Sequence, residues 1–252
     1  MSEIQVMTNA EPFFFEGSEV GCLVCHGFTG TTQSMRFLGE FLANEGGLTV
    51  LGPRLKGHGT SVEDMAQSTA EEWIRSVEAG LQTLQEQCSQ IFITGLSMGG
   101  TLTLYTAAMH PEVIKGTIPI NGAVFVNNPD MAGLAFMANA PATVPGVGGD
   151  IKKPNVEELA YKDVPVPTIR QLYALMSVTR ELLPRITCPS LVFQSRDDHV
   201  VVPDNAPFIV DNIGAEDKRL FWLDNSYHVA TLDNDKELIA RETLKFIQRV
   251  TG

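Results

Sequence analysis

The chain has 252 residues, of which 44% are hydrophobic and 19% are charged, and its formal net charge is −12 at pH 7. A chain of this length can bury one large core as a single domain, and its negative charge disfavours nucleic acids and anionic membranes as partners while suiting a neutral substrate. No apolar run approaches the ~18 residues of a membrane span and Met1–Gln5 carries no export signal, so we expect a cytoplasmic protein without stable membrane insertion.

Strand and helix patterns alternate through the first half of the chain. Short apolar, β-branched runs predict strands, and apolar residues that recur every three or four positions predict helices. Thr69 and Glu72 have the spacing of a capping box, which marks the start of one helix. The predicted strands cover 12–16, 20–26, 48–51, a run that starts at Ile91, and 114–120, and the predicted helices cover 33–45, 70–88 and 101–109.

Residues 122–187 interrupt this alternation. They contain a Pro- and Gly-rich piece from Pro141 to Gly149, no predicted strand, and two predicted helices near 155–161 and 167–183. The alternation then resumes with strands at 190–195 and 219–223 and helices at 205–213 and 235–249. This pattern predicts an α/β core with a mostly parallel sheet and helices on both faces, made of residues 1–121 and 188–252, with 122–187 as an insertion.

The stretch Gly95-Leu96-Ser97-Met98-Gly99 joins a predicted strand to a predicted helix. In this context a Gly-x-Ser-x-Gly motif is a nucleophile elbow, a sharp turn that exposes the serine and needs small residues on both sides of it. At the start of a helix, free N–H groups and the helix dipole stabilise negative charge that develops near Ser97. The motif therefore predicts Ser97 as a catalytic nucleophile.

A serine nucleophile needs a base that removes its proton and an acid that holds the base. In this architecture the acid and the histidine follow the serine in that order. His228 is the predicted base because it follows the last predicted strand, at the sheet edge where open α/β sheets collect their active sites. Asp198 is the favoured acid because of its spacing to Val201 and Pro203, and the adjacent Asp197 is the alternative.

An oxyanion hole needs two backbone N–H donors aimed at the reacting carbonyl oxygen. One donor is the residue after the nucleophile, here Met98, and the other lies in the loop after an earlier strand, here Phe28. Gly27 lets this loop approach the substrate. We therefore predict that Phe28 and Met98 stabilise an oxyanion through their main chains.

The four cysteines are Cys22, Cys25, Cys88 and Cys188, and we expect them to be reduced and to behave as small buried apolar residues. The segment Cys22–His26 matches the C-x-x-C-H pattern of covalent haem attachment. We reject haem there because the segment is apolar and has the pattern of a core strand. The sequence predicts neither a metal site nor a cofactor.

Four motifs together carry a resemblance to a known family. The segments His26–Thr31, Arg54–Thr60, Gly95–Thr101 and Asn225–Asp233 resemble those of the bacterial monoacylglycerol lipases of the α/β-hydrolase superfamily and, more distantly, the small bacillar carboxylesterases. The match runs from near residue 11 to the C-terminus and is weakest at 123–150. The resemblance implies an α/β-hydrolase fold and a serine hydrolase that cleaves monoacylglycerols to glycerol and fatty acid through an acyl-enzyme.

The resemblance also bears on individual residues. It implies the triad and the two oxyanion donors named above, and it favours Asp198 over Asp197. Residues 122–187 would form a cap over the acyl site, and the carboxylate of Glu158 would lie near its glycerol end. A general carboxylesterase that acts on short or medium acyl esters is the alternative, whereas a non-catalytic binding protein is disfavoured because no triad member is missing.

One apolar segment of the proposed cap has two interpretations. Its residues either pack on the core alone or line a tunnel for the acyl chain, because a cap that excludes water must offer the chain an apolar face. We expect the tunnel. The residues concerned are Met131, Leu134, Ala135, Phe136, Met137 and Ala138.

Overall fold

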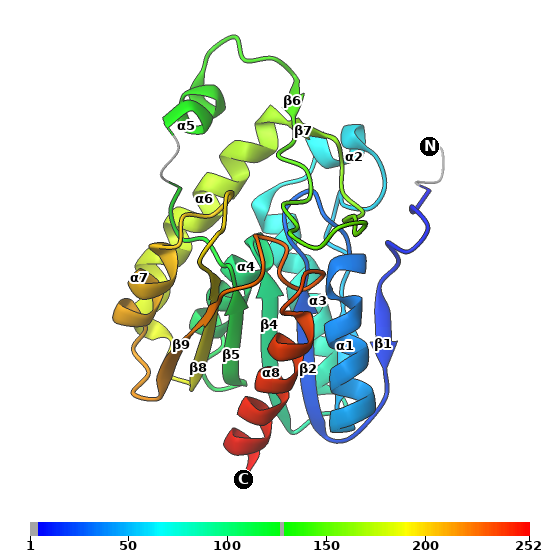
Figure 1. Ribbon diagram of the computed structural model, residues 1–252, viewed down its shortest axis with the longest axis vertical. Helices are drawn as coiled ribbons and strands as arrows, with labels where there is room; N and C mark the ends of the chain where they lie inside the picture. Colours follow the sequence, from blue (N-terminus) through cyan, green and yellow to red (C-terminus); the bar gives the residue numbers. More distant parts are fainter. Residues whose placement is uncertain (1–4, 127–128) are drawn as a thin grey trace.

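The computed structural model describes residues 5–126 and 129–252, and a seven-stranded sheet runs through its centre (Figure 1). Its strands are β1 (Phe13–Phe15), β2 (Val20–Cys25), β3 (Thr49–Gly52), β4 (Gln90–Leu96), β5 (Ile114–Ile120), β8 (Ser190–Ser195) and β9 (Lys218–Leu223). They lie in the order β1-β3-β2-β4-β5-β8-β9, and all pairs are parallel except β1 with β3. The predicted fold class, an α/β fold with a mostly parallel sheet, is confirmed.

Side chains alternate along the central strands and build one core on each face of the sheet. In β2, Cys22 and Val24 belong to one buried cluster, and Leu23 and Cys25 belong to the other. This alternation explains why β2 has no polar side chain: both of its faces are covered, as in other parallel sheets. It also explains why the cysteine pair of the C-x-x-C-H pattern is buried rather than available to a haem.

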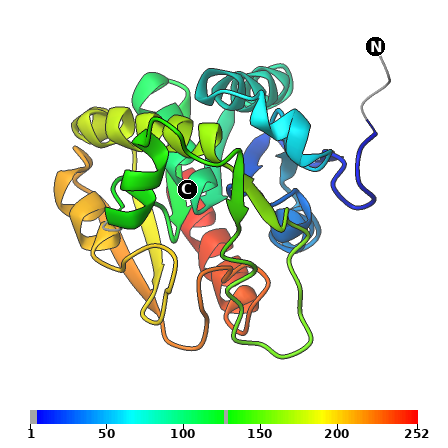
Figure 2. The ribbon, with the colours of Figure 1, turned by 90° about the horizontal axis from the view of Figure 1, so that it is seen from above.

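Helices cover both faces of the sheet (Figures 1 and 2). The cluster on one face takes its helical residues from α1 (Gln33–Gly46) and α8 (Lys236–Thr251). The other face is covered by α3 (Ala70–Gln85), α4 (Met98–Met109) and α7 (Asn205–Asn212). The predicted capping box is present, since the Thr69 hydroxyl accepts from the Glu72 N–H and the Glu72 carboxylate accepts from the Thr69 N–H. A short helix, α2 (Val62–Ala66), was not predicted.

The insertion, residues 122–187, lies beyond the carboxyl ends of the strands (Figure 1). It contains α5 (Pro129–Phe136), a two-stranded hairpin of β6 (Thr143–Pro145) and β7 (Asp163–Pro165), α6 (Val166–Leu182) and a single 3-10 turn at Leu183–Arg185. Seen from above, α5, α6 and this hairpin extend across the end of the sheet (Figure 2). The long helix predicted at 167–183 is confirmed, whereas the two strands of the hairpin were not predicted.

The helix predicted near 155–161 is wrong, because this segment begins in a turn at Asn155 and continues without regular secondary structure. Its backbone groups bond to the core instead of to one another. The Leu159 N–H donates to Gln33 Oε1 at 3.1 Å, and Gln33 Nε2 donates to the Glu157 carbonyl at 3.3 Å. The Tyr161 N–H donates to the Thr29 carbonyl at 3.1 Å. Long-range partners therefore override the local helical pattern.

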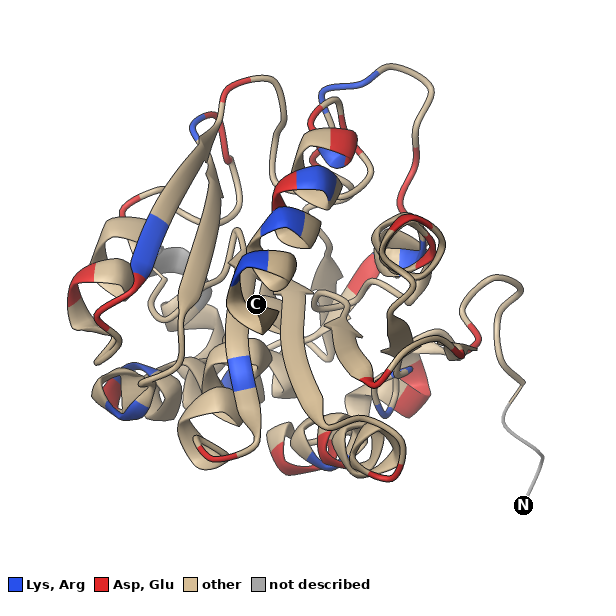
Figure 3. Ribbon diagram, turned by 90° about the horizontal axis from the view of Figure 1, so that it is seen from below, with Lys and Arg blue, Asp and Glu red and all other residues tan. Residues whose placement is uncertain are grey.

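The charged residues are distributed over the outer elements. Seen from the end opposite the insertion, acidic positions lie on several helices and loops with basic positions between them (Figure 3). The net negative charge is thus spread over the surface rather than confined to one tail. In the described ranges, 5–126 and 129–252, no helix combines the length and the hydrophobicity needed to cross a membrane. Residues 1–4, part of the segment in which no export signal was predicted, lie outside the described residues.

Candidate active site

The turn between β4 and α4 holds Ser97 in a strained conformation. Its φ is 56° and its ψ is −119°, so an L-residue takes a positive φ here. A Cβ on Gly95 would lie 2.3 Å from the Gly99 carbonyl oxygen, and a Cβ on Gly99 would lie 2.2 Å from the Cys25 carbonyl oxygen. Both glycines are therefore required by close backbone packing, which is the geometry that the elbow motif predicts.

The His228 ring pairs with Asp198 and not with Asp197. His228 Nδ1 lies 2.8 Å from Asp198 Oδ2, and the two side chains are 8% and 0% exposed. Asp197 points to solvent, with 61% of its side chain exposed, and lies 3.6 Å from the Lys152 Nζ. With its Nδ1 proton held by a carboxylate, His228 keeps the Nε2 lone pair for a proton acceptor role.

Burial and charge compete to set the protonation of His228. Burial disfavours the imidazolium, but the carboxylates of Asp198, Glu158 and Asp150 favour it, and the net effect raises the pKa of His228 above its ordinary value. Asp198 accepts from three donors besides the His228 ring, namely Gln194 Nε2 and the Val200 and Val201 N–H groups. These bonds fix the carboxylate beside the ring.

The loop after β2 brings the predicted oxyanion donor next to the serine. A Cβ on Gly27 would lie 3.4 Å from the Ser97 Cβ, so the two turns are in contact. Within the described part of the chain, neither the Phe28 N–H nor the Met98 N–H donates to a protein acceptor. Both are therefore free to bind an oxyanion, and a free N–H at the first turn of a helix is expected for Met98.

An aromatic cluster supports this loop from below. The Phe28 and Trp73 rings pack edge to face with their centroids 5.8 Å apart. The centroid of the His58 ring lies 5.8 Å from that of Trp73 and 5.1 Å from that of His26. Burial lowers the pKa of His26 to about 3 and that of His58 to about 4, so both rings are neutral at pH 7. His26 Nε2 accepts from the Leu55 N–H at 3.2 Å. The histidines of the first two motifs thus belong to the packed aromatic cluster against the loop after β2.

A cavity of about 190 Å³ connects the predicted site residues. Ser97, His228, Phe28, Met98 and Glu158 all line it, although no hydrogen bond joins the Ser97 and His228 side chains among the described contacts. Most of the remaining lining is apolar and comes from the insertion, chiefly from β6, β7 and α6. An apolar cavity with a few convergent polar groups is the usual form of a small-molecule site.

Glu158 lies at the polar part of this cavity. A Cβ on Gly30 would meet Glu158 Oε1 at 2.6 Å, so the carboxylate packs directly on the oxyanion loop. Burial of the carboxylate raises the pKa of Glu158 to about 7, despite the opposing attraction of His228. Glu158 is therefore a carboxyl group that changes its protonation near neutral pH within the same cavity as Ser97.

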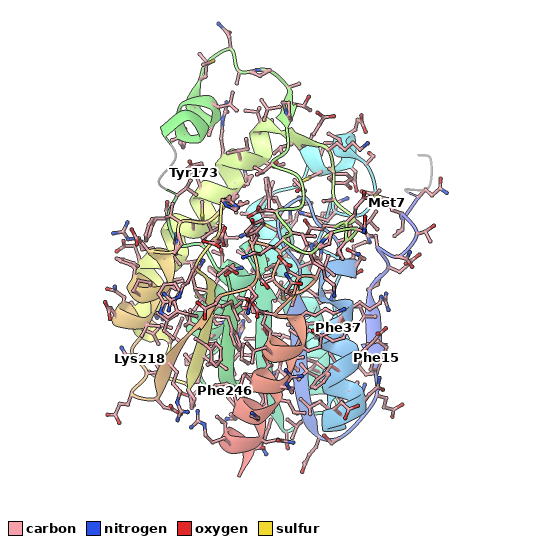
Figure 4. All side chains as sticks on the ribbon, viewed as in Figure 1. Met7, Phe15, Phe37, Tyr173, Lys218 and Phe246 are labelled. Carbon is pink, nitrogen blue, oxygen red and sulfur yellow. The ribbon has the colours of Figure 1, made fainter. Side chains whose placement is uncertain are left out.

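The expected tunnel lining at 131–138 is largely wrong. Leu134 lines the cavity, but Ala135 is buried against Val166 and Ile169, and Phe136 and Met137 are 69% and 51% exposed. Ala138 is exposed as well, and the Met131 side chain lies outside the described residues. Tyr173 of α6 lies below α5 (Figure 4), and its ring contacts that of Phe136 at 6.2 Å. The apolar lining comes instead from α6, through Ile169, Leu172 and Met176.

The chain matches known proteins over nearly its whole length. The model of the alpha/beta hydrolase family matches residues 22–242. The chain belongs to the alpha/beta hydrolase family. It is 48% identical over 248 residues to a thermostable monoacylglycerol lipase of Bacillus sp. (strain H-257), and the match covers 98% of each chain. It is 30% identical over 241 residues to a carboxylesterase of Bacillus subtilis (strain 168), covering 95% of this chain and 97% of the relative.

A solved structure agrees with these matches. A chain described with LipS and LipT, two metagenome-derived lipolytic enzymes, superposes on this alpha/beta hydrolase with a TM-score of 0.95. The two chains are 52% identical, and the match covers 97% of this chain and 100% of the other. The family and the fold that the four motifs indicated are therefore confirmed, and the protein is a hydrolase.

Two residues of the hydrolase site were missed by sequence analysis. Asn121, at the end of β5, has a φ of 46°, and its Nδ2 donates to the His228 carbonyl at 2.6 Å and to Ser195 Oγ at 3.1 Å. Tyr161, in the insertion, donates from its hydroxyl to the Gly57 carbonyl at 2.9 Å. An asparagine that directly follows a strand, where it tolerates positive φ, was a usable signal for Asn121. Tyr161 had no such signal, because its partner lies 104 residues away.

Proposed function

We propose that the protein is a serine esterase in which Ser97, His228 and Asp198 form the catalytic triad. The observation that carries this proposal is the buried His228–Asp198 pair, whose histidine lines one mostly apolar cavity together with Ser97 on its strained elbow. Each partner occupies the structural position that the role requires: strand-to-helix turn for the nucleophile, and strand-end loops for acid and base. The names of both bacillar relatives describe enzymes that cleave carboxylic esters, which supports this reaction class.

The geometry supports an acyl-enzyme reaction in which each of these residues has a role. Ser97 Oγ attacks the ester carbonyl carbon while His228 Nε2 takes the hydroxyl proton, and the Phe28 and Met98 N–H groups stabilise the resulting oxyanion. His228 then protonates the leaving alcohol, and the ester C–O bond breaks to give an acyl-enzyme. Water, deprotonated by His228, attacks the acyl carbon and releases the carboxylic acid and free Ser97. Asp198 holds the imidazole and stabilises its cation throughout.

Monoacylglycerols are the substrates that we infer. The relative with 48% identity is named a thermostable monoacylglycerol lipase, and the cavity has a mostly apolar lining with a few polar groups, among them Glu158. Each methylene of an acyl chain buried there contributes up to about 0.8 kcal/mol. A general carboxylesterase activity is the second candidate, supported by the name of the relative with 30% identity.

In this proposal residues 122–187 are the cap of a core made of residues 1–121 and 188–252. The cap would exclude water from the acyl-enzyme, and two anchors support this role. Tyr161 binds the loop at residues 57–60, and residues 157–161 bind α1 and the oxyanion loop. We expect the enzyme to act in the cytoplasm, where its four free, buried cysteines remain reduced.

We predict that monoacylglycerols are cleaved at least about tenfold faster than triacylglycerols in kcat/KM, which corresponds to roughly 1.4 kcal/mol of transition-state discrimination. The cavity of about 190 Å³ is lined largely by the insertion, and we expect it to exclude two further acyl chains. The measurement is the initial rate on mono-, di- and trioleoylglycerol and on monoacylglycerols of increasing chain length. Efficient cleavage of trioleoylglycerol would identify a true lipase, and a preference for short simple esters would identify a carboxylesterase.

We also predict that above pH 7, where Glu158 with its raised pKa is ionised, Glu158→Ala lowers kcat/KM on a monoacylglycerol by roughly tenfold more than on a p-nitrophenyl ester of the same acyl chain, because hydrogen bonds to charged groups contribute about 1.5–3 kcal/mol. The glycerol hydroxyls are donors that a carboxylate can accept, whereas p-nitrophenol has none. Glu157→Ala is the matched control, because Glu157 is adjacent in sequence but exposed. Equal losses on both substrates in the Glu158 variant would remove Glu158 from the glycerol site.

A further inference from the structure

A third carboxylate connects the two loops that carry the acid and the base. Asp150 lies in the insertion, and only 14% of its side chain is exposed. Its Oδ2 accepts from the His228 N–H at 3.1 Å and from the His199 N–H at 3.2 Å. One oxygen atom thus binds the backbone of the base and the backbone of the residue directly after Asp198.

The other polar atoms of Asp150 strengthen the same connection. Its Oδ1 lies 2.9 Å from His199 Nδ1, and its carbonyl oxygen accepts from the Val229 N–H at 3.0 Å. The side chain and the main chain of one insertion residue therefore hold two successive residues of the histidine loop. Hydrogen bonds to an ionised acceptor are about twice as strong as those between neutral groups, so these contacts favour a carboxylate over an amide.

Asp233 makes the reciprocal connection from the core. It is fully buried, and its two oxygens accept from four backbone N–H groups at 2.7–2.9 Å. Two of these donors, Lys152 and Lys153, lie in the insertion, and the other two, Tyr227 and Asn234, lie beside the histidine loop. Each side of the contact thus supplies a carboxylate to N–H groups of the other.

We propose that Asp150 is a positioning residue that sets the separation of the acid loop from the base, so that the insertion fixes the catalytic pair as well as enclosing the substrate. The proposal rests on the proposed function, because it assumes that His228 and Asp198 act together. The His228 backbone is held from both sides, since Asn121 binds its carbonyl and Asp150 its N–H. With the backbone fixed in this way, the ring can swing only about its own side-chain bonds.

The test compares two substitutions at the same position. Asp150→Asn keeps an acceptor oxygen for the two backbone N–H groups while it removes the charge and places an NH₂ group opposite His199 Nδ1, whereas Asp150→Ala removes the acceptor as well. A displacement of 1 Å in a catalytic group can cost on the order of 10² in rate. We therefore expect Asp150→Ala to lower kcat by about tenfold or more with KM changed less than about twofold, and Asp150→Asn to recover most of that loss.

The pH profile is the readout that a purely structural role would not move. Activity rises with pH as His228 loses its proton, and the charges that face its ring are Asp198, Glu158 and Asp150. Because the negative charge of Asp150 raises the pKa of His228, its removal in Asp150→Asn should move the acid limb of kcat/KM to lower pH. A protonated His199, which contacts Asp150, would partly offset this change.

Asp163→Ala and Asp163→Asn are the matched controls, because Asp163 lies in the same insertion, is exposed, and donates or accepts no side-chain hydrogen bond in the described contacts. Active sites are counted by titration with a fluorophosphonate, so that kcat refers to folded enzyme. A kcat for Asp150→Ala within twofold of the wild type, or a loss equal to that of Asp163→Ala, would overturn the proposal. If Asp150→Ala does not fold, an unmoved acid limb in Asp150→Asn overturns it instead.

The same series separates this inference from the proposed function. Ser97→Ala and His228→Ala report on the triad itself. If both are inactive while Asp150→Ala is fully active, only the positioning role fails. If either retains substantial activity, the triad assignment fails, whatever the Asp150 variants show.

Discussion

Ser97→Ala is expected to lower kcat for ester hydrolysis by on the order of 10⁴–10⁶ while leaving the fold intact, because triad members act as a unit and the loss of the nucleophile removes the attacking oxygen. Ser97 is already at positive φ, and alanine in its place carries the same Cβ and the same backbone strain. The substitution removes a hydroxyl that points into a cavity rather than into the packed core. Stability should therefore change little.

The measurement is the rate on a monoacylglycerol and on a p-nitrophenyl ester, together with thermal unfolding. Ser89→Ala is the control, because Ser89 directly precedes β4 at its other end and its hydroxyl binds only the exposed Glu19 carboxylate. A fluorophosphonate should label the wild type and the Ser89 variant but not the Ser97 variant. More than about a tenth of wild-type activity in Ser97→Ala would exclude this serine as the nucleophile.

Local features made the elbow and the sheet predictable from sequence. The elbow is a contiguous turn whose strained φ at Ser97 and tight contacts at Gly95 and Gly99 demand a particular order of residue types. The strands of the core are short apolar runs because both faces of a parallel sheet are covered, and this composition is visible without any partner. These elements accordingly lie close to their predicted bounds.

The insertion was less predictable because its conformation depends on distant partners. The segment near 155–161 has a helical pattern, but Asn155 takes a φ of 60° and the backbone beyond it binds Gln33 and Thr29. Asp150 follows a Gly-rich piece with no motif around it, and its partners lie 49 and 78 residues away. Positioning residues of this kind are recognised by their contacts with segments distant in the sequence, and a single sequence does not show which segments meet.

The identity of the acid was only partly predictable from the sequence. Asp197 and Asp198 are adjacent in one loop, so the spacing to Val201 and Pro203 favoured Asp198 but left Asp197 as the alternative. In the turn after β8 the two side chains point in different directions, because Asp198 turns inward to His228 and Asp197 turns outward to Lys152. The alternative assignment can therefore be tested by exchanging one carboxylate at a time.

Asp198→Asn should lower kcat by on the order of 10⁴, the loss found when the aspartate of a serine protease triad becomes asparagine. The physical reason is the set of N–H groups that donate hydrogen bonds to this side chain. Asp198 Oδ1 accepts from the Val200 and Val201 N–H groups, so an asparagine oxygen stays there and its NH₂ group replaces Oδ2. That NH₂ would donate to His228 Nδ1, which forces the ring proton onto Nε2 and leaves no base facing Ser97.

Asp197→Asn is the matched control and should leave kcat within about twofold of the wild type, because an exposed ion pair contributes only about 0–1 kcal/mol to stability. Its one charged partner is the Lys152 Nζ at 3.6 Å, and both side chains are substantially exposed. Both variants are measured with the same two esters, and their active sites are counted by fluorophosphonate titration. If Asp197→Asn loses more activity than Asp198→Asn, the acid is Asp197 and the loop must rearrange before catalysis. If the two variants lose equally little activity, His228 works without either carboxylate. That result would contradict the role proposed for Asp198, which is to stabilise the buried imidazolium of His228.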